Sequence, residues 1–258
     1  MESGFPVLDQ FDVQLAAFIL VFGRVGAALM VMPGIGDTFV SPRVRLAFAL
    51  LLALVVTPVV AEVLPATDFG TEFLLLLVQE IGVGLFIGLA ARVLMAAVQV
   101  AGTVISFQIS LANAFVLDPA SGQQESVTAN LMTTLAVVLI LVGDLHHLLL
   151  AGLVDSYATF HPGALPPIGD FAASIATLAA ASFRIGVQLA APFLLVGIIV
   201  ALGMGLLARL MPQVQIFFIA LPLQIAVGFF LLALTLTAAM TWFLGEFATM
   251  HGNLIRGA

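Results

Sequence analysis

Aspartates near glycine, tyrosine or histidine are the residues of this chain whose types and spacing could support catalysis. The sequence GIGD, Gly34 to Asp37, has the form that a catalytic aspartate takes in some membrane-embedded proteases. That chemistry needs a second aspartate to share a proton with the first, usually directly after a tyrosine. The only tyrosine, Tyr157, is followed by Ala158. Pro33 and Gly34 also predict a turn here, so we do not expect proteolysis.

A second candidate is the sequence GDLHH, which ends at His147 and contains residue types that bind zinc. It lacks the His-Glu-x-x-His spacing of zinc proteases. On a helix we expect the adjacent His146 and His147 to diverge by about 100°. Asp144 and His147, three residues apart, can instead pair at a helix end. There is also no Gly-x-Ser-x-Gly nucleophile motif, so the sequence predicts no enzyme, no catalytic residue, no metal and no cofactor.

The composition indicates a membrane protein without a soluble domain. Of 258 residues, 62% are hydrophobic and only 8% are charged, and the mean hydropathy is +1.24. Soluble domains do not reach such values. There is no cysteine, and the formal net charge of −7 comes without a basic patch, which excludes nucleic acid as a partner. The acidic N-terminal residues do not resemble a secretory signal, so we expect the first apolar run to be retained.

Six apolar runs are candidate membrane spans, because about 20 apolar residues in a helix cross a bilayer. They are residues Val13 to Met32, Val44 to Leu64, Phe73 to Ile105, Val127 to Val142, Phe171 to Leu210 and Ile216 to Phe247. Two runs are much longer than one span needs. Pro192 predicts a break in the fifth run, although hydropathy cannot distinguish one kinked helix from two. We therefore expect an all-α membrane protein with about six long, kinked helical segments arranged as hairpins.

Arginine positions predict the orientation, since cytoplasmic loops retain positive charge. Arg43 and Arg45 lie at the connection of the first two runs, and Arg209 lies at the connection of the last two. Six spans then place both termini outside the cytoplasm, although Arg256 near the C-terminus opposes this assignment.

Charges within the apolar runs need a protein partner or water, because an ionised group in hydrocarbon costs at least about 2.5 kcal/mol. They are Arg24, Glu80, Arg92 and Arg184. One interpretation is a transport pathway, and the other is a structural ion pair within a helical assembly. Gly84 and Gly88, in the sequence GVGLFIG, form a GxxxG pattern that predicts tight helix packing.

A polar stretch separates the third and fourth apolar runs. A loop at membrane depth is tolerated only where it is buried in protein or lines a water-filled cavity. Between residues 106 and 126, Phe107, Leu111, Phe115, Val116 and Leu117 can pack, while Asn113, Asp118, Ser121, Gln123 and Gln124 can satisfy polar groups. Pro119 and Gly122 prevent another helix. We expect a re-entrant loop here, and the alternative is an ordinary exposed hairpin loop.

Four stretches of the chain resemble the FliR family of flagellar type III export-gate subunits, also known as the SctT/FliR family. They are FVLDPASGQQ, GDLHHLLLAGLVDSYATFHPG, FGRVGAALMVMPGIGDTFVSPRVRLAFALLLALVVTP and LLARLMPQVQIFFIALPLQIAVGF. Together these stretches cover nearly the whole chain in order. The combination of Asp-Pro-Ala-Ser, Asp-x-His-His and Met-Pro-Gln elements is far more specific than any one of them.

The resemblance implies a structural and gating subunit that forms a protein-export channel with FliP and FliQ. FlhB and FlhA are further implied partners, exported unfolded flagellar proteins are the implied substrates, and membrane lipid surrounds the gate. The implied location is the flagellar basal body in the bacterial inner membrane. FliR-like chains also serve virulence injectisomes, and the sequences SGQQ and DLHHLLL favour the flagellar system. A secondary solute transporter is the remaining alternative.

The resemblance also implies an internal division of the chain. Residues 1–166 are similar to FliP and include the loop, and residues 167–258 are similar to the FliQ hairpin. Independently, the sequence HPGALPPIGD reads as a connector at this point.

In FliR-like proteins the polar stretch plugs the lumen, which implies that role for residues 106–124. Asn113 and Ala114 precede the single Phe115, at a place where related chains can carry a second aromatic residue. The resemblance therefore does not identify the side chain that seals the lumen. The connection between the last two runs, with Arg209, Pro212, Gln213 and Gln215, is expected to face the cytoplasm. Pro212 and Pro222 at its two ends predict that it is not a continuous helix.

Overall fold

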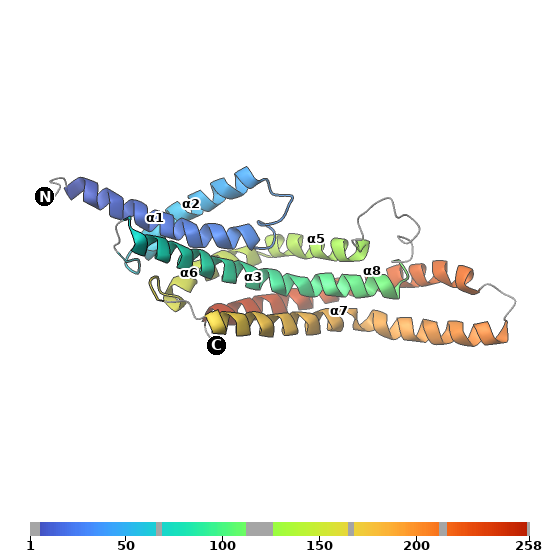
Figure 1. Cartoon of the computed structure of the whole chain (residues 1–258). Helices are drawn as coiled ribbons and strands as arrows, with labels where there is room; N and C mark the ends of the chain where they lie inside the picture. The colour runs from blue at the N-terminus through green and yellow to red at the C-terminus, as the bar shows by residue number, and fades with distance from the viewer. Residues whose placement is uncertain (1–5, 66–68, 112–125, 165–167, 212–215, 257–258) are drawn as a thin grey trace. The chain divides into compact units, whose positions relative to one another are not determined.

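The computed structural model describes residues 6–65, 69–111, 126–164, 168–211 and 216–256, and all regular structure in these ranges is helical. The helices are α1 (Pro6–Val31), α2 (Pro42–Val60), α3 (Thr71–Gln108), α5 (Val127–Val142), α6 (Leu145–Thr159), α7 (Ile168–Leu210) and α8 (Ile216–Arg256) (Figure 1). The predicted all-α class is therefore confirmed, and the bounds predicted for the fourth run match α5. The predicted re-entrant loop between α3 and α5 lies mainly outside the described residues.

The helices are long and apolar enough for a membrane protein. Five can cross a bilayer by length and composition, and there are six candidate spans if α5 and α6 form one broken span. With 43 residues, α7 is about 64 Å long at a rise of 1.5 Å per residue. The hydrocarbon core is only about 30 Å thick. A single perpendicular crossing therefore cannot accommodate the whole of α7.

The chain forms two compact units that do not follow the order of the sequence. Unit 1 comprises residues 1–93, 140–178 and 248–258, and unit 2 comprises residues 94–139 and 179–247. Helices α3, α7 and α8 each contribute to both units. The predicted division at residue 166 rests on resemblance to FliP and FliQ. Contacts within this chain do not test that resemblance, so the division stays a prediction.

In unit 1, glycines allow α1 and α3 to approach each other closely. A Cβ atom added to Gly84 would collide with the carbonyl oxygen of Arg24, and one added to Gly88 would lie 2.6 Å from the carbonyl oxygen of Ala28. Both glycines therefore face the backbone of α1. The tight packing predicted from the GxxxG pattern is confirmed.

Small residues also set the packing in unit 2. A Cβ atom on Gly102 of α3 would collide with the Cα atom of Ala129 in α5. One on Gly186 of α7 would lie 2.8 Å from the carbonyl oxygen of Ala97 in α3. Helix α3 is therefore in close contact with both α5 and α7, and α7 and α8 run side by side as a hairpin (Figure 1).

Two expectations about prolines are wrong. The fifth run does not break at Pro192, because α7 is continuous from Ile168 to Leu210. The last connection is also shorter than predicted, since α8 begins at Ile216 and contains Pro222. Each proline removes one backbone hydrogen bond, and the remaining bonds and the apolar surroundings maintain the helix.

A sharp bend that the sequence analysis did not predict separates α5 from α6. The two helices make an angle of 73° at a break of two residues, Gly143 and Asp144. Asp144 adopts the left-handed conformation, with φ 58°. Aspartate is among the few residues other than glycine that tolerate this conformation. Helix α6 belongs to unit 1, where Leu149 and Leu153 are buried.

The contact at Gly84 makes a prediction about stability with a control in the same helix. Gly84→Ala should lower the free energy of unfolding by about 1–3 kcal/mol, because its methyl group overpacks the backbone of α1. Gly82→Ala should leave the free energy of unfolding unchanged or raise it, because a Cβ atom there meets nothing within 4 Å and alanine favours the helix. Thermal unfolding of the detergent-purified chain measures both. Equal effects would contradict the close α1–α3 contact.

Candidate functional site

A buried cluster of polar groups in unit 1 is built around Arg24. The Arg24 guanidinium donates to both carboxylate oxygens of Glu80, at 2.6 Å from Nε to Oε2 and 2.9 Å from Nη2 to Oε1. Both side chains are at least 98% buried. Arg24 is carried by α1 and Glu80 by α3, one helical turn before Gly84. The glycine contact thus brings the two helices close enough for a two-point ion pair.

Helix α6 and Phe160, the residue that follows it, supply further partners of Arg24. Its Nη1 donates to the hydroxyl oxygen of Ser156 at 3.1 Å, and Nη2 donates to the carbonyl oxygen of Phe160 at 2.9 Å. The Ser156 hydroxyl in turn donates to the carbonyl oxygen of Leu153. The guanidinium also lies 3.8 Å from the centre of the Tyr157 ring, a cation–π contact. These partners use most of the N–H donors of the guanidinium, so few remain for any other group.

A second, partly exposed pair connects α3 to the turn after α1. Arg92 Nη1 lies 3.4 Å from Asp37 Oδ1 and donates to the carbonyl oxygen of Val31 at 3.3 Å. Asp37 Oδ2 accepts from the backbone nitrogen of Gly34 at 2.8 Å. Arg45 of α2 donates to carbonyl oxygens of the same turn, including that of Asp37 at 2.8 Å. Asp37 therefore stabilises the predicted turn.

The fourth charge predicted within an apolar run has a different setting. Arg184 is exposed on the part of α7 that belongs to unit 2. The four charges thus have three different settings. Arg24 and Glu80 pair in the interior, Arg92 binds a turn, and Arg184 faces the surroundings of the single chain.

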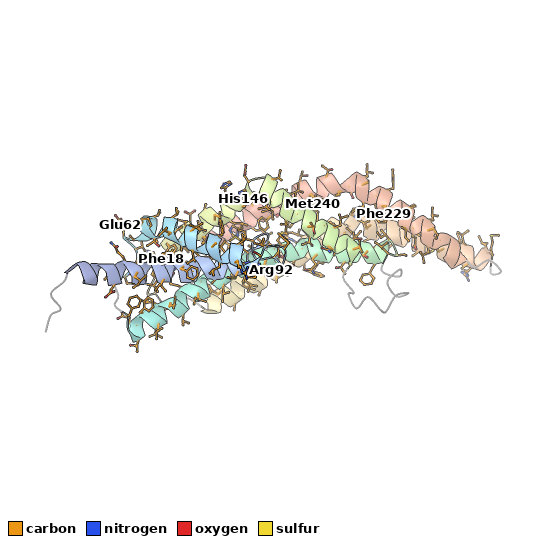
Figure 2. The ribbon with its side chains drawn as sticks, turned by 90° about the horizontal axis from the view of Figure 1, so that it is seen from above. Phe18, Glu62, Arg92, His146, Phe229 and Met240 are labelled. Atoms are coloured by element: carbon orange, nitrogen blue, oxygen red, sulfur yellow. The ribbon has the colours of Figure 1, made fainter. Side chains whose placement is uncertain are left out.

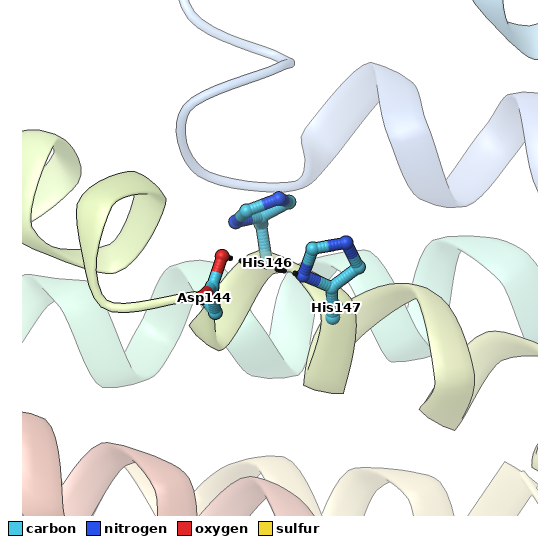
Figure 3. Close-up of side chains that lie close together, drawn as sticks. All are labelled: Asp144, His146 and His147. Atoms are coloured by element: carbon cyan, nitrogen blue, oxygen red, sulfur yellow. Dashed lines mark ion pairs between the residues drawn. The ribbon is translucent and has the colours of Figure 1, made fainter.

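Asp144, His146 and His147 lie together at the bend between α5 and α6 (Figure 3). The expectation that the histidines diverge is wrong, since their ring centroids are 4.1 Å apart. The predicted pairing is confirmed, with 3.6 Å between His147 Nδ1 and Asp144 Oδ1. One potential ligand atom from each residue lies within 4.8 Å of the others. These three residues could supply metal ligands, although Asp144 and His147 are largely exposed and already pair with each other.

Of the residues predicted to close a lumen, the structure describes only the first two, Phe107 and Leu111. Phe107 is in the last turn of α3 and is 67% exposed, and Leu111 is half-buried in the turn that follows. Asn113, Phe115, Val116, Leu117, Asp118, Pro119 and Ser121 lie outside the described residues. Of the predicted hairpin turn, Arg209 is exposed in the last turn of α7. Pro212, Gln213 and Gln215 also lie outside the described residues.

Sequence reasoning did not identify the partners that α6 offers to Arg24. Ser156 lies 132 residues and Phe160 136 residues away along the chain, so no local pattern connects them to Arg24. The one available signal was Tyr157, a single tyrosine in a chain with 21 phenylalanines. A lone phenolic ring among so many apolar ones indicates a polar or cationic neighbour.

Comparisons with known proteins identify relatives along nearly the full chain. A model of the family described as bacterial export proteins, family 1, matches residues 15–250. The flagellar biosynthetic protein FliR of Caulobacter vibrioides is 41% identical over 236 residues, covering 90% of this chain and 92% of that protein. FliR of Bacillus subtilis is 36% identical, covering 88% and 86%. The Yop proteins translocation protein T of Yersinia pestis is 28% identical, covering 88% of each chain.

The Arg24–Glu80 pair makes a prediction about single and double substitutions. Arg24→Met should destabilise the chain by about 3–5 kcal/mol, because it leaves a buried carboxylate without its counter-charge. Arg24→Met combined with Glu80→Met should cost less than Arg24→Met alone, since neither charge is then buried unpaired. Thermal unfolding of the purified chain compares the variants.

Arg92→Met is the matched control, because it removes an arginine whose side chain is 50% exposed. Its expected cost is at most about 1 kcal/mol. A double variant less stable than the single Arg24→Met variant would contradict the interpretation that the charges need each other.

Proposed function

The chain belongs to the bacterial export proteins of family 1, and we propose that it is a structural and gating subunit of the flagellar type III protein-export gate. The observation that carries the proposal is the 41% identity to a flagellar FliR over 90% of the chain. Proteins of this family are membrane components of a secretion apparatus rather than enzymes. The lower identity of 28% to a Yop translocation protein favours the flagellar system over the injectisome.

The exposed apolar faces of α7 and α8 support a subunit that needs neighbours. In the most apolar window of α1 and of α3, 50% of the residues are buried, whereas the corresponding share in α7 and α8 is 17%. Large apolar side chains project from both helices in unit 2, among them Phe229 of α8 (Figure 2). Lipid covers about 30 Å of such a hairpin. We infer that protein partners cover apolar surface beyond that length.

FliP and FliQ are the partners that we propose for these faces, with FlhB and FlhA as further components of the export apparatus. The proposed location is the basal body in the bacterial inner membrane, and the proposed cargo is unfolded flagellar protein. A secondary transporter is less well supported. Such proteins use midplane charges to bind solute, whereas Arg24 and Glu80 are occupied by each other and by α6.

We also propose that residues 106–124 close the resting channel. A lumen wide enough for an unfolded chain would leak ions, so a gate needs a segment that excludes water and can move without breaking the scaffold. The sequence supplies apolar side chains up to Leu117 for exclusion. A loop opens more easily than a helix, because it has fewer backbone hydrogen bonds to lose.

Affinity purification from membranes tests the proposed assembly. The tagged chain, expressed from its native locus, should retain FliP-like and FliQ-like proteins in stoichiometric amounts through detergent washing. The physical reason is that detergent alone covers the apolar faces of α7 and α8 less well than matched protein surfaces. A monodisperse single chain that transports a small solute into liposomes would instead favour the transporter.

Membrane permeability tests the proposed closure. Phe115→Ser combined with Leu117→Ser should raise the permeability of cells to a small ion, because polar side chains admit water into an apolar constriction. Phe39→Ser is the control, since Phe39 is 68% exposed in the turn between α1 and α2. If the assembled complex with the double substitution is as tight as the parent, residues 106–124 are not the closure.

A further inference from the structure

The last turn of α3 is seated on the α7–α8 hairpin within unit 2. A Cβ atom added to Gly228 of α8 would collide with the side chain of Ile109. One added to Gly197 of α7 would collide with the side-chain oxygen of Gln108. The two glycines thus leave a notch, defined here as the surface around Gly197 and Gly228, that receives Gln108 and Ile109.

The backbone ends α3 at this notch with a specific hydrogen-bond pattern. The backbone nitrogen of Leu111 donates to the carbonyl oxygen of Ser106 at 3.0 Å, and that of Ser110 donates to the carbonyl oxygen of Phe107 at 3.2 Å. This pair of bonds is a Schellman ending, in which the residue at the position of Ser110 is left-handed and usually glycine. Ser110 has φ 58°. A serine in this conformation is strained relative to glycine.

A side-chain hydrogen bond to α8 accounts for the serine. The Ser110 hydroxyl donates to Gln224 Oε1 at 2.7 Å, across 114 residues of sequence. Glycine would relieve the backbone strain but could not make this bond. A cavity of about 20 Å³, lined by Gln108, Gln224 and both notch glycines among others, lies beside the contact. The cavity has room for about one water molecule, so the contact between α3 and the notch is packed less tightly than a protein core.

We propose that Gln108, Ile109 and Ser110 form a latch that fixes the C-terminal end of α3 to the α7–α8 hairpin. Gly228 and Gln224 are its receiving residues, and Ser110 is the positioning residue. The backbone strain at Ser110 opposes the hydrogen bond to Gln224, so the latch can release without unfolding α3. The functional consequence rests on the proposed closure by residues 106–124, since movement of the hairpin would then move the start of that segment.

Thiol labelling in the assembled complex tests the latch. The chain has no cysteine, so Leu111→Cys provides a single reporter in the half-buried position after Ser110. Gln224→Leu removes the acceptor oxygen at similar size, Ser110→Gly removes the donor and relieves the strain, and Gly228→Ala fills the notch. Gln224→Leu should raise the labelling rate by a water-soluble maleimide about fivefold, the effect of one lost hydrogen bond on an opening equilibrium. Gly228→Ala should also raise it, because its methyl group displaces Ile109. Ser110→Gly should raise it less than Gln224→Leu, because relief of the backbone strain offsets the lost bond.

The matched control is Gly245→Ala on α8, because a Cβ atom there meets nothing within 4 Å. Its labelling rate should equal that of the reporter alone. Unchanged rates in both Gln224→Leu and Gly228→Ala would overturn the latch. Should Gly228→Ala prevent assembly, Gln224→Leu decides the question by itself.

Ion permeability of the same membranes separates the latch from the gate. Faster labelling with unchanged permeability would support the latch and contradict closure by residues 106–124. Unchanged labelling with raised permeability would overturn the latch and leave the closure in place. Faster labelling with raised permeability supports both.

Discussion

The charge of Arg24 is the constraint on which the packing of unit 1 depends. A guanidinium in an apolar interior has five N–H donors to satisfy and a counter-charge to find. Glu80 on α3, Ser156 on α6 and the carbonyl oxygen of Phe160 supply these partners. Since the three partners come from segments far apart in the sequence, the pair fixes the register of α1 against both other helices. Apolar contacts alone would allow the helices to slide, because neighbouring apolar positions are nearly equivalent.

Close approach and charge pairing depend on each other. Gly84 lies one turn after Glu80 and faces the backbone of the residue that carries the guanidinium. With any larger residue the helices would separate, and the short bonds between Arg24 and Glu80 would lengthen. The GxxxG pattern therefore does more here than provide van der Waals contact, since it also sets the geometry of an ion pair. The described helices of unit 2 bury no charged side chain. There, glycine contacts and the Ser110–Gln224 hydrogen bond fix how the helices pack.

The sequence predicted those features that local patterns determine. The apolar run from Val127 to Val142 correctly predicted the bounds of α5. The spacing of Gly84 and Gly88 correctly predicted a close helix contact, which α3 makes with α1. The sequence did not predict α6, because Gly143 and Asp144 ended the apolar run and hydropathy does not reveal that a second helix starts at once. Pro192 and Pro222 wrongly predicted interruptions, since one missing hydrogen bond does not end a helix of about 40 residues. The partners of Arg24 depend on tertiary contacts, and a single sequence contains no information on which distant residues meet.

The distribution of polar groups indicates where the function of the chain resides. The interior charges of unit 1 are satisfied within the unit, so they can hold a scaffold but are not available to bind a moving solute. The apolar faces of α7 and α8 are largely unburied in the single chain, which assigns them to lipid and to other proteins. In unit 2, the polar side chains of Gln108, Ser110 and Gln224 lie together at the C-terminal end of α3. The fully paired, buried cluster of unit 1 and the polar contact of unit 2, which has a cavity beside it, therefore differ in how tightly they are packed.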